Sequence, residues 1–482
     1  MIVRLLTNEE ALFTELADVV RIFYPGIVRS DEGDFIIRHE GKSDGANWCD
    51  RFEAEGREYT HLTPMQAEGL LAVKRERKRA AKTGLFLLLR EITGVNPVWG
   101  SLTGIRPTRL LYELMENGET SDSAARHLMD DFYVSEEKAA LIQEIERMQR
   151  GVRTVPSDQF DLYIGIPFCV TRCSYCSFSS GELGNGKLVA PYVDALVREI
   201  RICGEMMREK NLRVRAAYMG GGTPTSISAK DLARILDEAQ RAFPGAVEWT
   251  VEAGRPDTID REKLAAIRDY NVGRISVNPQ TFSDETLRRI GRAHTAQDTL
   301  DAFRLAREMG FNHINMDIIA ALPGERLPDF KRTLDTVISL DPESVTVHSL
   351  AIKRSSRLHE ELVTDKDDYA PPEDAADMIR HARVSLSEAG YYPYYLYRQK
   401  YMAGNLENTG YAKANHACLY NIGNMEETAR VLALGAGAVT KWLFDRERRI
   451  ERAPNVRNIE EYINRVEEMT ERKRTLIGGE EV

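Results

Sequence analysis

Short apolar runs alternate with helix-like stretches from residue 160 onward. Each run is only a few residues long and is bounded by polar or turn residues, which is typical of a buried strand. Six strands are predicted, at 160–166, 214–219, 247–252, 274–277, 314–320 and 344–350. The stretches between and after them predict helices at 192–208, 231–243, 261–270, 298–309, 329–340 and 372–390.

Six strand–helix units in series predict a parallel sheet, because parallel neighbours need a crossover connection of a dozen residues or more. Six units are too few for a closed eight-unit barrel and favour an open, partial one. In such sheets the chemistry lies at the carboxyl ends of the strands. The expected fold class is therefore α/β, with a partial parallel barrel of six units.

The segments on either side of this series have different patterns. Residues 1–155 predict a separate mixed α/β domain, with short strands at 34–39 and 58–61 and a long helix at 66–92. The stretch at 151–158, which contains Gly and Pro, is interpreted as a linker. After residue 390 the chain becomes rich in Tyr, Asn and Gly, and this segment is expected to close the open side of the barrel. The predicted domains are 1–155, 156–390 and 391–482.

Composition narrows the class of protein. A length of 482 residues favours two to four domains at about 150 residues each. Apolar residues make up 43% and charged residues 29%, which excludes a disordered, collagenous or disulfide-stapled chain. The net charge of −10 argues against a nucleic-acid partner, and the basic run at 74–79, with Lys82, is interpreted as a solvated helical face.

The apolar runs also bear on the cellular compartment. None approaches the roughly 20 residues that a membrane-spanning helix needs, so no membrane insertion is expected. Asn8, Glu9 and Glu10 interrupt the N-terminal sequence before a signal-peptide apolar region could form. A cytoplasmic location is expected, and the cysteines should be reduced there.

Three of the six cysteines carry the candidate chemistry. Cys169, Cys173 and Cys176 have the spacing C-x3-C-x2-C and follow the first strand of the series directly. Structural zinc takes four closed ligands, and no second cysteine or histidine pair completes such a set. An iron–sulfur cluster held by three cysteines instead keeps one iron open for a substrate or cofactor. The spacing therefore favours a cluster over buried thiols or a zinc knuckle.

This spacing, with an aromatic residue before the last cysteine, resembles the radical S-adenosylmethionine (SAM) superfamily. Within it, residues 160–437 resemble the oxygen-independent coproporphyrinogen III dehydrogenase family. The shared motifs are Gly220-Gly-Gly-Thr-Pro224, Val251-Glu-Ala253, Arg274-Ile-Ser-Val-Asn-Pro-Gln-Thr-Phe282, Gly291-Arg-Ala-His294, Asn315-Met-Asp-Ile-Ile319, Leu322-Pro-Gly324 and Leu434-Gly-Ala-Gly437. Residues 1–155, with Gly100-Ser-Leu-Thr-Gly-Ile-Arg-Pro-Thr108, resemble the branch called HemZ.

The resemblance implies two cofactors, a 4Fe-4S cluster and SAM, in a partial barrel of radical SAM type. It implies Cys169, Cys173 and Cys176 as the cluster ligands. The positions that it assigns to SAM are Gly220, Gly221, Gly222, Thr223, Glu252, Gln280, Arg292 and Asp317. Without the resemblance, a glycine triplet before proline is more often a turn, and the four polar residues would be ordinary solvated or capping groups.

The function implied by the resemblance is the anaerobic oxidative decarboxylation of coproporphyrinogen III to protoporphyrinogen IX. One electron from the reduced cluster would cleave SAM, and the resulting 5'-deoxyadenosyl radical would abstract hydrogen from the substrate. The implied partners are a tetrapyrrole substrate and a low-potential electron donor such as flavodoxin or ferredoxin. No individual residue is predicted to be catalytic.

Two alternatives remain open at this point, a haem chaperone of the same family and a radical SAM methyltransferase acting on haem. The dehydrogenase pattern has another cysteine two places beyond the last ligand, where this chain has Phe178, and a polar residue where it has Val170. Phe178 favours the alternatives. The long N-terminal domain favours the dehydrogenase.

A substrate with four propionates needs cations and room for a macrocycle. Lys353 and Arg354 follow the sixth strand, and the segment 391–401 mixes tyrosines with cations. His348 ends the sixth strand and is a further candidate contact. The alternative interpretation is ordinary packing by the tyrosines, solvation by the exposed cations and a core position for the histidine.

Overall fold

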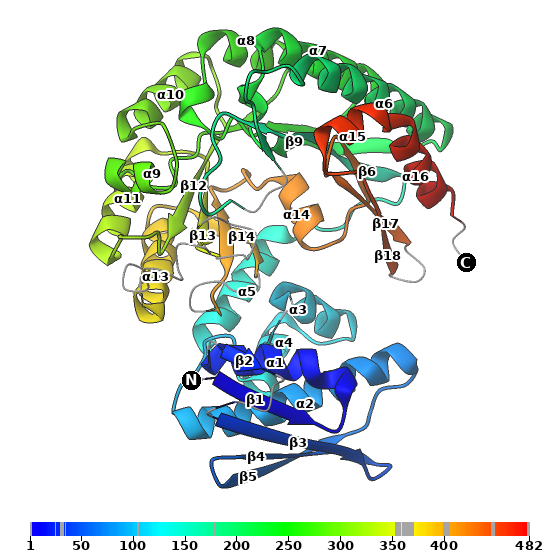
Figure 1. Ribbon diagram of the computed structural model, residues 1–482, viewed down its shortest axis with the longest axis vertical. Helices are drawn as coiled ribbons and strands as arrows, with labels where there is room; N and C mark the ends of the chain where they lie inside the picture. Colours follow the sequence, from blue (N-terminus) through cyan, green and yellow to red (C-terminus); the bar gives the residue numbers. More distant parts are fainter. Residues whose placement is uncertain are drawn as a thin grey trace. The chain divides into compact units, whose positions relative to one another are not determined.

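The computed structural model describes residues 2–24, 26–28, 33, 35–103, 106–176, 180–351, 358, 371–398, 405–444 and 449–479. The chain divides into two compact units, Met1–Glu144 and Ile145–Val482 (Figure 1). The division into three domains at 155 and 390 stays a prediction. In the described part of the chain, no helix has the length and apolar character needed to cross a membrane.

The first unit contains a five-stranded sheet in the order β2-β1-β3-β4-β5. Its strands are β1 (Ile2–Thr7), β2 (Gly26–Val28), β3 (Phe35–Ser43), β4 (Asn47–Ala54) and β5 (Arg57–Pro64). Strands β2, β1 and β3 are parallel, and β3, β4 and β5 are antiparallel. The two strands predicted here correspond to β3 and β5. The sequence pattern missed β1, β2 and β4.

Helices of the first unit are α1 (Phe13–Phe23), α2 (Leu70–Thr93), α3 (Pro107–Glu116), α4 (Ser121–Phe132) and α5 (Glu136–Gln149), which continues into the second unit. Leu16 and Val20 on α1, Phe52 on β4 and Leu85 and Leu89 on α2 belong to one buried apolar core. The long helix predicted at 66–92 is therefore confirmed as α2, and its apolar face holds it against the sheet.

The basic run on α2 is only partly the solvated face that was predicted. Arg77 is buried, and its guanidinium donates to both carboxylate oxygens of Asp50 and to Glu9. His39 lies on the other side of Asp50, with its Nε2 2.8 Å from Oδ1. Burial works to raise the pKa of Asp50, but these partners lower it overall, so the carboxylate stays charged. Lys82 is also buried and donates to the carbonyl of Thr103.

The second unit contains an eleven-stranded sheet in the order β14-β15-β13-β12-β11-β10-β9-β6-β16-β17-β18. The six predicted strands are confirmed as β6 (Gln159–Ile166), β9 (Arg213–Gly221), β10 (Glu248–Val251), β11 (Arg274–Ser276), β12 (Ile314–Ala320) and β13 (Ser344–Ser349). Neighbours among them are parallel throughout. Strands β7 (Phe168–Cys169) and β8 (Gly181–Glu182) form a separate pair.

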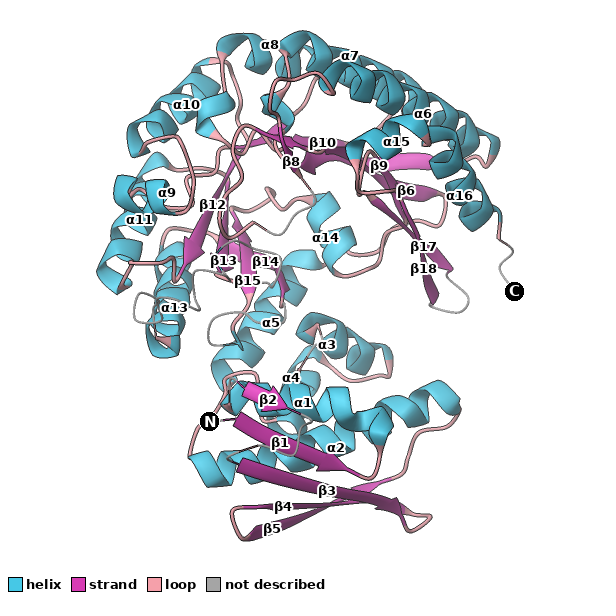
Figure 2. Ribbon diagram, in the orientation of Figure 1, coloured by secondary structure: helices cyan, strands magenta, loops and turns pink. Residues whose placement is uncertain are grey.

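Helices cover the outer, convex side of this curved sheet (Figure 2). They are α6 (Val189–Glu209), α7 (Ala229–Ala242), α8 (Arg261–Asp269), α9 (Asp284–Arg289), α10 (Ala296–Glu308), α11 (Leu327–Leu340) and α13 (Pro372–Glu388). Helices α7, α8, α9 and α10 begin after Ser228, Asp260, Ser283 and Thr295, whose side chains accept a hydrogen bond from the first helical turn. The predicted helices are confirmed, and α9 is an addition.

The C-terminal segment extends both edges of the sheet. Strands β14 (Tyr392–Tyr397) and β15 (Asn408–Ala412) continue it antiparallel beyond β13. Strand β16 (Val431–Leu434) lies parallel to β6, and β17 (Val439–Phe444) and β18 (Arg449–Pro454) follow antiparallel. The chain ends in α15 (Ile459–Asn464) and α16 (Val466–Gly478), which contact α6.

Helix α14 (Leu419–Met425) lies on the concave side of the sheet (Figure 1). The carboxylate of Glu248, on β10, accepts hydrogen bonds from the backbone N–H groups of Leu419 and Tyr420, at 3.1 and 3.2 Å. Arg215, on β9, donates to the carbonyl of Leu419 and forms an ion pair with Asp161. Two strands therefore anchor the start of α14.

We expect Glu248→Ala to lower the free energy of unfolding by about 2 kcal/mol, because the first N–H groups of α14 lose their acceptor. Denaturant unfolding followed by circular dichroism measures the change. Glu388→Ala, at an exposed position at the end of α13, is the matched control and should change little. Equal stability of the two variants would contradict the anchoring role.

Candidate functional site

A cavity of about 430 Å³ opens on the concave side of the second sheet. It begins at the carboxyl ends of the parallel strands and reaches down to residues such as Arg274 and Ser344 near their starts. The predicted site residues that line it are Cys169, Cys173, Cys176, Gly221, Gly222, Thr223, Glu252, Gln280, Arg292 and Asp317. Gly220 is the one predicted site residue that does not line it.

The cysteine loop is fixed by hydrogen bonds from neighbouring loops. The carbonyl of Cys169 accepts from the backbone N–H of Leu183 at 2.7 Å. The Thr171 hydroxyl donates to the carbonyl of Gly291, and the N–H of Ser174 donates to the carbonyl of Ile290. The loop between α9 and α10 therefore holds the middle of the cysteine motif.

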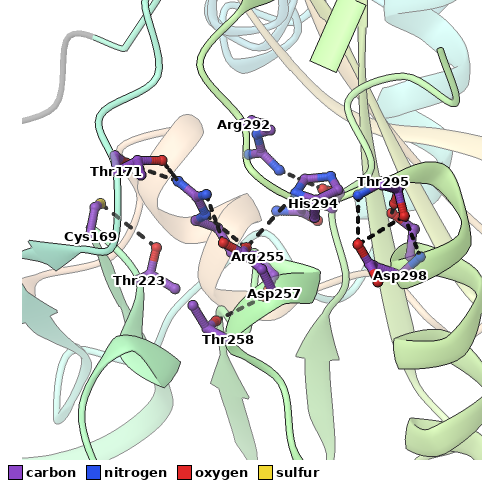
Figure 3. A network of polar contacts seen from close by, with 12 residues as sticks. Cys169, Thr171, Thr223, Arg255, Asp257, Thr258, Arg292, His294, Thr295 and Asp298 are labelled. Atoms are coloured by element: carbon purple, nitrogen blue, oxygen red, sulfur yellow. Dashed lines mark hydrogen bonds and ion pairs between the residues drawn. The ribbon is translucent and has the colours of Figure 1, made fainter. Parts of the chain in front are cut away.

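Arg255 is a second support of this loop (Figure 3). Its Nη1 donates to both the carbonyl and the hydroxyl of Thr171, each at 2.9 Å. The rest of its guanidinium makes a two-pronged ion pair with Asp257, at 3.1 and 2.9 Å. Arg255 is 3% exposed. Sequence reasoning missed it, although it lies two residues after the Val251-Glu-Ala253 motif, at a strand end where functional side chains are expected.

The glycine triplet leaves room where two other groups approach. A Cβ on Gly222 would lie 3.0 Å from the Cys169 Sγ, and a Cβ on Gly220 would lie 2.7 Å from the Glu252 Oε2. Gly221 has φ +111°, a conformation that residues with side chains rarely adopt. Gly221 therefore requires glycine for its backbone conformation, and Gly222 for its space beside Phe168 and Cys169.

Glu252, just after β10, and Asp317, on β12, face the cavity with opposite pKa shifts. Burial raises the pKa of Glu252 to about 7, against the effect of the Tyr218 hydroxyl that donates to it. Burial also acts to raise the pKa of Asp317, but His348 and Asn315 outweigh it and the pKa is lowered. The Asn315 Nδ2 donates to Asp317 at 2.7 Å, and the His348 Nε2 lies 3.6 Å away. The cavity therefore holds one permanent carboxylate and one that titrates near neutrality.

Arg292 and Gln280 are positioned by the backbone around β11 and β12. The Arg292 Nη1 donates to the carbonyl of Asn278 at 2.8 Å, whereas its buried Nε has no hydrogen-bond partner among the described residues (Figure 3). Burial alone would lower the pKa of Arg292, but Tyr175 and Cys173 beside it raise it. Gln280 has φ +65° and pairs through its backbone with Asp317 and Ile319. A buried guanidinium N–H without an acceptor fits an anionic ligand group.

Among the residues that the structure describes, no three His, Cys, Asp or Glu side chains lie close enough to share one metal ion. A mononuclear zinc site needs such a group. In an iron–sulfur cluster each cysteine binds a different iron atom, so its ligands lie farther apart. Three thiols that line one cavity supply the kind of donor set that an iron–sulfur cluster needs.

Several predicted substrate contacts fall outside the described residues. These are Lys353, Arg354, Lys400 and Tyr401, and the same holds for Phe178. Of the described candidates, His348, Tyr394, Tyr395 and Tyr397 line the cavity. Tyr391 does not, and its hydroxyl donates to the carbonyl of Pro342.

The class of protein is defined by two features of a partial parallel barrel. A cysteine motif and the glycine-rich end of a strand line the same cavity. Residues 163–337 match the model of the Radical SAM superfamily. The chain is 41% identical over 397 residues to the "Oxygen-independent coproporphyrinogen-III oxidase-like protein HemZ" of Bacillus subtilis (strain 168), with 80% of this chain and 78% of that protein covered. The chain therefore belongs to the radical SAM superfamily and, within it, to this coproporphyrinogen oxidase-like family.

Two further similarities bear on the fold and the family. The chain is 30% identical over 279 residues to the "Heme chaperone HemW" of the same organism, covering 57% of this chain and 69% of that one. The solved structure of coproporphyrinogen III oxidase (HemN) from Escherichia coli matches with a TM-score of 0.53 and 21% identity, over 70% of this chain and 74% of that one. The predicted radical SAM fold is thereby confirmed.

Membership of the superfamily establishes the two predicted cofactors, a 4Fe-4S cluster and SAM. We propose that Cys169, Cys173 and Cys176 ligate the cluster. We propose that Arg292 binds the SAM carboxylate. We propose that the remaining polar groups of SAM are bound by the backbone of the glycine triplet, Glu252, Gln280 and Asp317.

Each of Cys169→Ala, Cys173→Ala and Cys176→Ala should abolish the brown absorbance of the cluster, because a thiolate ligand is lost. Iron and sulfide analysis after anaerobic reconstitution measures the effect. Cys49→Ala, in the first unit, is the matched control and should keep a full iron load. A full load in any of the three variants would exclude that cysteine as a ligand.

The raised pKa of Glu252 predicts a pH dependence of stability. Its protonated form is favoured in the folded protein, so the unfolded protein ionises first as pH rises from the ordinary pKa of 4.5 to about 7. In this window the contribution of Glu252 to the free energy of unfolding falls, by on the order of 2 kcal/mol. Denaturant unfolding of the cluster-free protein at about pH 5 and about pH 8 should show this fall in the wild type and a smaller one in Glu252→Gln. Parallel pH profiles would refute the assignment.

Proposed function

We propose that this chain catalyses the anaerobic oxidative decarboxylation of two propionate arms of coproporphyrinogen III, giving protoporphyrinogen IX. The observation that carries the proposal is that one cavity is lined both by the cysteine motif and by tyrosines, which we call the tyrosine wall. They are Tyr163, Tyr218, Tyr394, Tyr395, Tyr397 and Tyr420. The 41% identity with a coproporphyrinogen-III oxidase-like protein, over most of both chains, supports the same substrate class.

When bound, the cluster and SAM supply one-electron chemistry that removes a hydrogen atom from a C–H bond. The chain's own residues bind and orient the reactants. Arg292 places a buried cation beside Cys173, where it holds a carboxylate close to the cysteine loop. Each arm loses carbon dioxide, one hydrogen atom and one electron, and the electron passes to an external one-electron acceptor, so no side chain has to transfer a proton.

The tyrosine wall supplies the flat, water-excluding surface that a macrocycle needs. The rings of Tyr218 and Tyr420 stack with centroids 4.7 Å apart, and Tyr163 stacks on Tyr420 at 6.3 Å. Tyr395 and Tyr397 form a second stacked pair at 6.4 Å. Each pyrrole ring of a tetrapyrrole is flat and largely apolar, so it packs well on such faces.

The proposal includes an external low-potential electron donor, such as flavodoxin or ferredoxin, and a location in the reducing cytoplasm. Neither follows from the fold. The electron donor is included because the cluster must be reduced to supply its electron, and the reducing compartment because it keeps the cysteine ligands as thiols.

A haem chaperone is the second candidate. The 30% identity with HemW over 279 residues favours it, since the same cofactors and cavity would then serve haem binding. Stoichiometric capture and transfer of haem, without conversion of coproporphyrinogen, would select this function. A methylated linear tetrapyrrole formed from haem would instead select the methyltransferase.

Anaerobic incubation of the reconstituted protein with coproporphyrinogen III, SAM and dithionite should yield protoporphyrinogen IX, 5'-deoxyadenosine and carbon dioxide. Mass spectrometry of the products measures the outcome, with Cys173→Ala as the matched inactive control. Production of 5'-deoxyadenosine without loss of carbon dioxide would reject this substrate and keep the radical chemistry. Absence of both would reject the enzyme.

A further inference from the structure

Three hydroxyl groups in the lower part of the cavity have no hydrogen-bond partner among the described residues. They are the Thr250 Oγ1 on β10, the Ser276 Oγ on β11 and the Ser344 Oγ on β13. All three residues line the cavity, and Thr250, Ser276 and Ser344 are 4%, 4% and 1% exposed, respectively. A buried hydroxyl without a partner costs about 1–3 kcal/mol, so three on one surface need an explanation.

The strand register shows that these residues share one surface. Ser276 pairs with Asn315 on β12, and Asn315 pairs with Ser344 on β13, while Thr250 pairs with Arg274 on the next strand. We call Thr250, Ser276 and Ser344 the hydroxyl floor. Asn315 lies among them, but its amide is already engaged by Asp317 and Thr346.

Thr250 and Asn315 lie below the proposed SAM contacts on the same strands. Thr250 precedes Glu252 by two residues, and Asn315 precedes Asp317 by two. Alternate residues of a strand point to the same face, so Thr250 and Asn315 belong to the same cavity wall as Glu252 and Asp317 and lie nearer the starts of their strands. A ligand group on the floor would therefore lie beside SAM and deeper in the cavity.

Arg274 is the cation beside this floor, where it forms an ion pair with Glu248. It is 5% exposed, lines the cavity and donates one N–H to the carbonyl of His416 at 2.8 Å. Its carboxylate neighbour, Glu248, lies 3.5 Å away and already accepts from the two N–H groups of α14 and from Cys418. Burial lowers the pKa of the nearby His313 to about 2, so this histidine adds no charge.

We propose that the hydroxyl floor and Arg274 bind carboxylate arms of the substrate, while a ring that bears an arm packs on Tyr420 and its stacked partners. Thr250 on β10 and Ser344 on β13 lie three strand positions apart in the sheet, roughly 14 Å at about 4.8 Å per strand, so they meet different arms. Each carboxylate has about four acceptor positions for hydroxyl and guanidinium donors. The substrate class is a planar pyrrole-type ring with a carboxylated side chain. This inference rests on the proposed function and adds which part of the cavity recognises the arms.

Variants that lack one of these hydroxyls distinguish substrate binding from a structural role, through their Tm and their affinity for the substrate. In the absence of substrate, removal of an unpartnered buried hydroxyl relieves a cost, so Thr250→Val, Ser276→Ala and Ser344→Ala should have an unchanged or higher Tm. The same variants should bind the substrate more weakly. We expect the Kd of coproporphyrin III and the KM of coproporphyrinogen III to rise about 5- to 30-fold in each.

The experiment uses cluster-loaded full-length protein with SAM. Quenching of porphyrin fluorescence gives the Kd of coproporphyrin III and of its tetramethyl ester, which lacks the charges. The ester should bind the wild type more weakly than the acid does, and the variants should bind the ester as the wild type does. Ser339→Ala, at an exposed position on α11, is the matched control for loss of a hydroxyl.

Two outcomes would overturn the proposal. If the variants keep the wild-type Kd and KM, the floor holds water and not the arms. If their Tm falls, the hydroxyls are structural. Failure of the proposed function is separate, because it appears as a wild type that binds coproporphyrin III but releases no carbon dioxide.

Discussion

Parallel pairing from β6 to β13 is the constraint on which the site depends, because it brings the carboxyl end of every strand to one edge. The cysteine loop follows β6, the glycine triplet ends β9, and Glu252 follows β10. Residues that are more than a hundred positions apart in the sequence thereby reach one cavity without a dedicated scaffold. Fine positioning comes from loop-to-loop bonds, above all the bridge from Asp257 through Arg255 to Thr171.

The two faces of this sheet differ more than is usual for parallel strands, which are commonly apolar on both sides. On β12, Met316 and Ile318 are buried against helices, whereas Asn315 and Asp317 alternate with them and face the cavity. In the described part of the chain, helices cover the convex face, and the polar side chains of the concave face line the cavity. The opposed pKa shifts of Glu252 and Asp317 follow from this arrangement, since one carboxyl has several donors around it and the other mainly Tyr218.

The barrel strands and their helices could be predicted because each is a short, bounded apolar run or a helical repeat, and these are local signals. The cysteines and the residues in the quoted motifs could be named for the same reason. Arg255 could not, since its role depends on a loop 84 residues away in the sequence. Nor could the burial of Arg77, which is set by its partners Asp50 and Glu9, or the way in which the C-terminal strands extend both edges of the sheet. Pairing of distant segments leaves little trace in a single sequence.

The place of β16 beside β6 has a consequence for the folding of the chain during its synthesis on the ribosome. One side of β6 stays without its neighbour until a strand about 270 residues later has been synthesised. At about 5–20 residues per second, a ribosome needs roughly 15–50 seconds to cover that distance. During this interval the nascent chain presents an open strand edge that invites wrong pairing. Chaperone protection and a low translation temperature should therefore favour recovery of the intact protein.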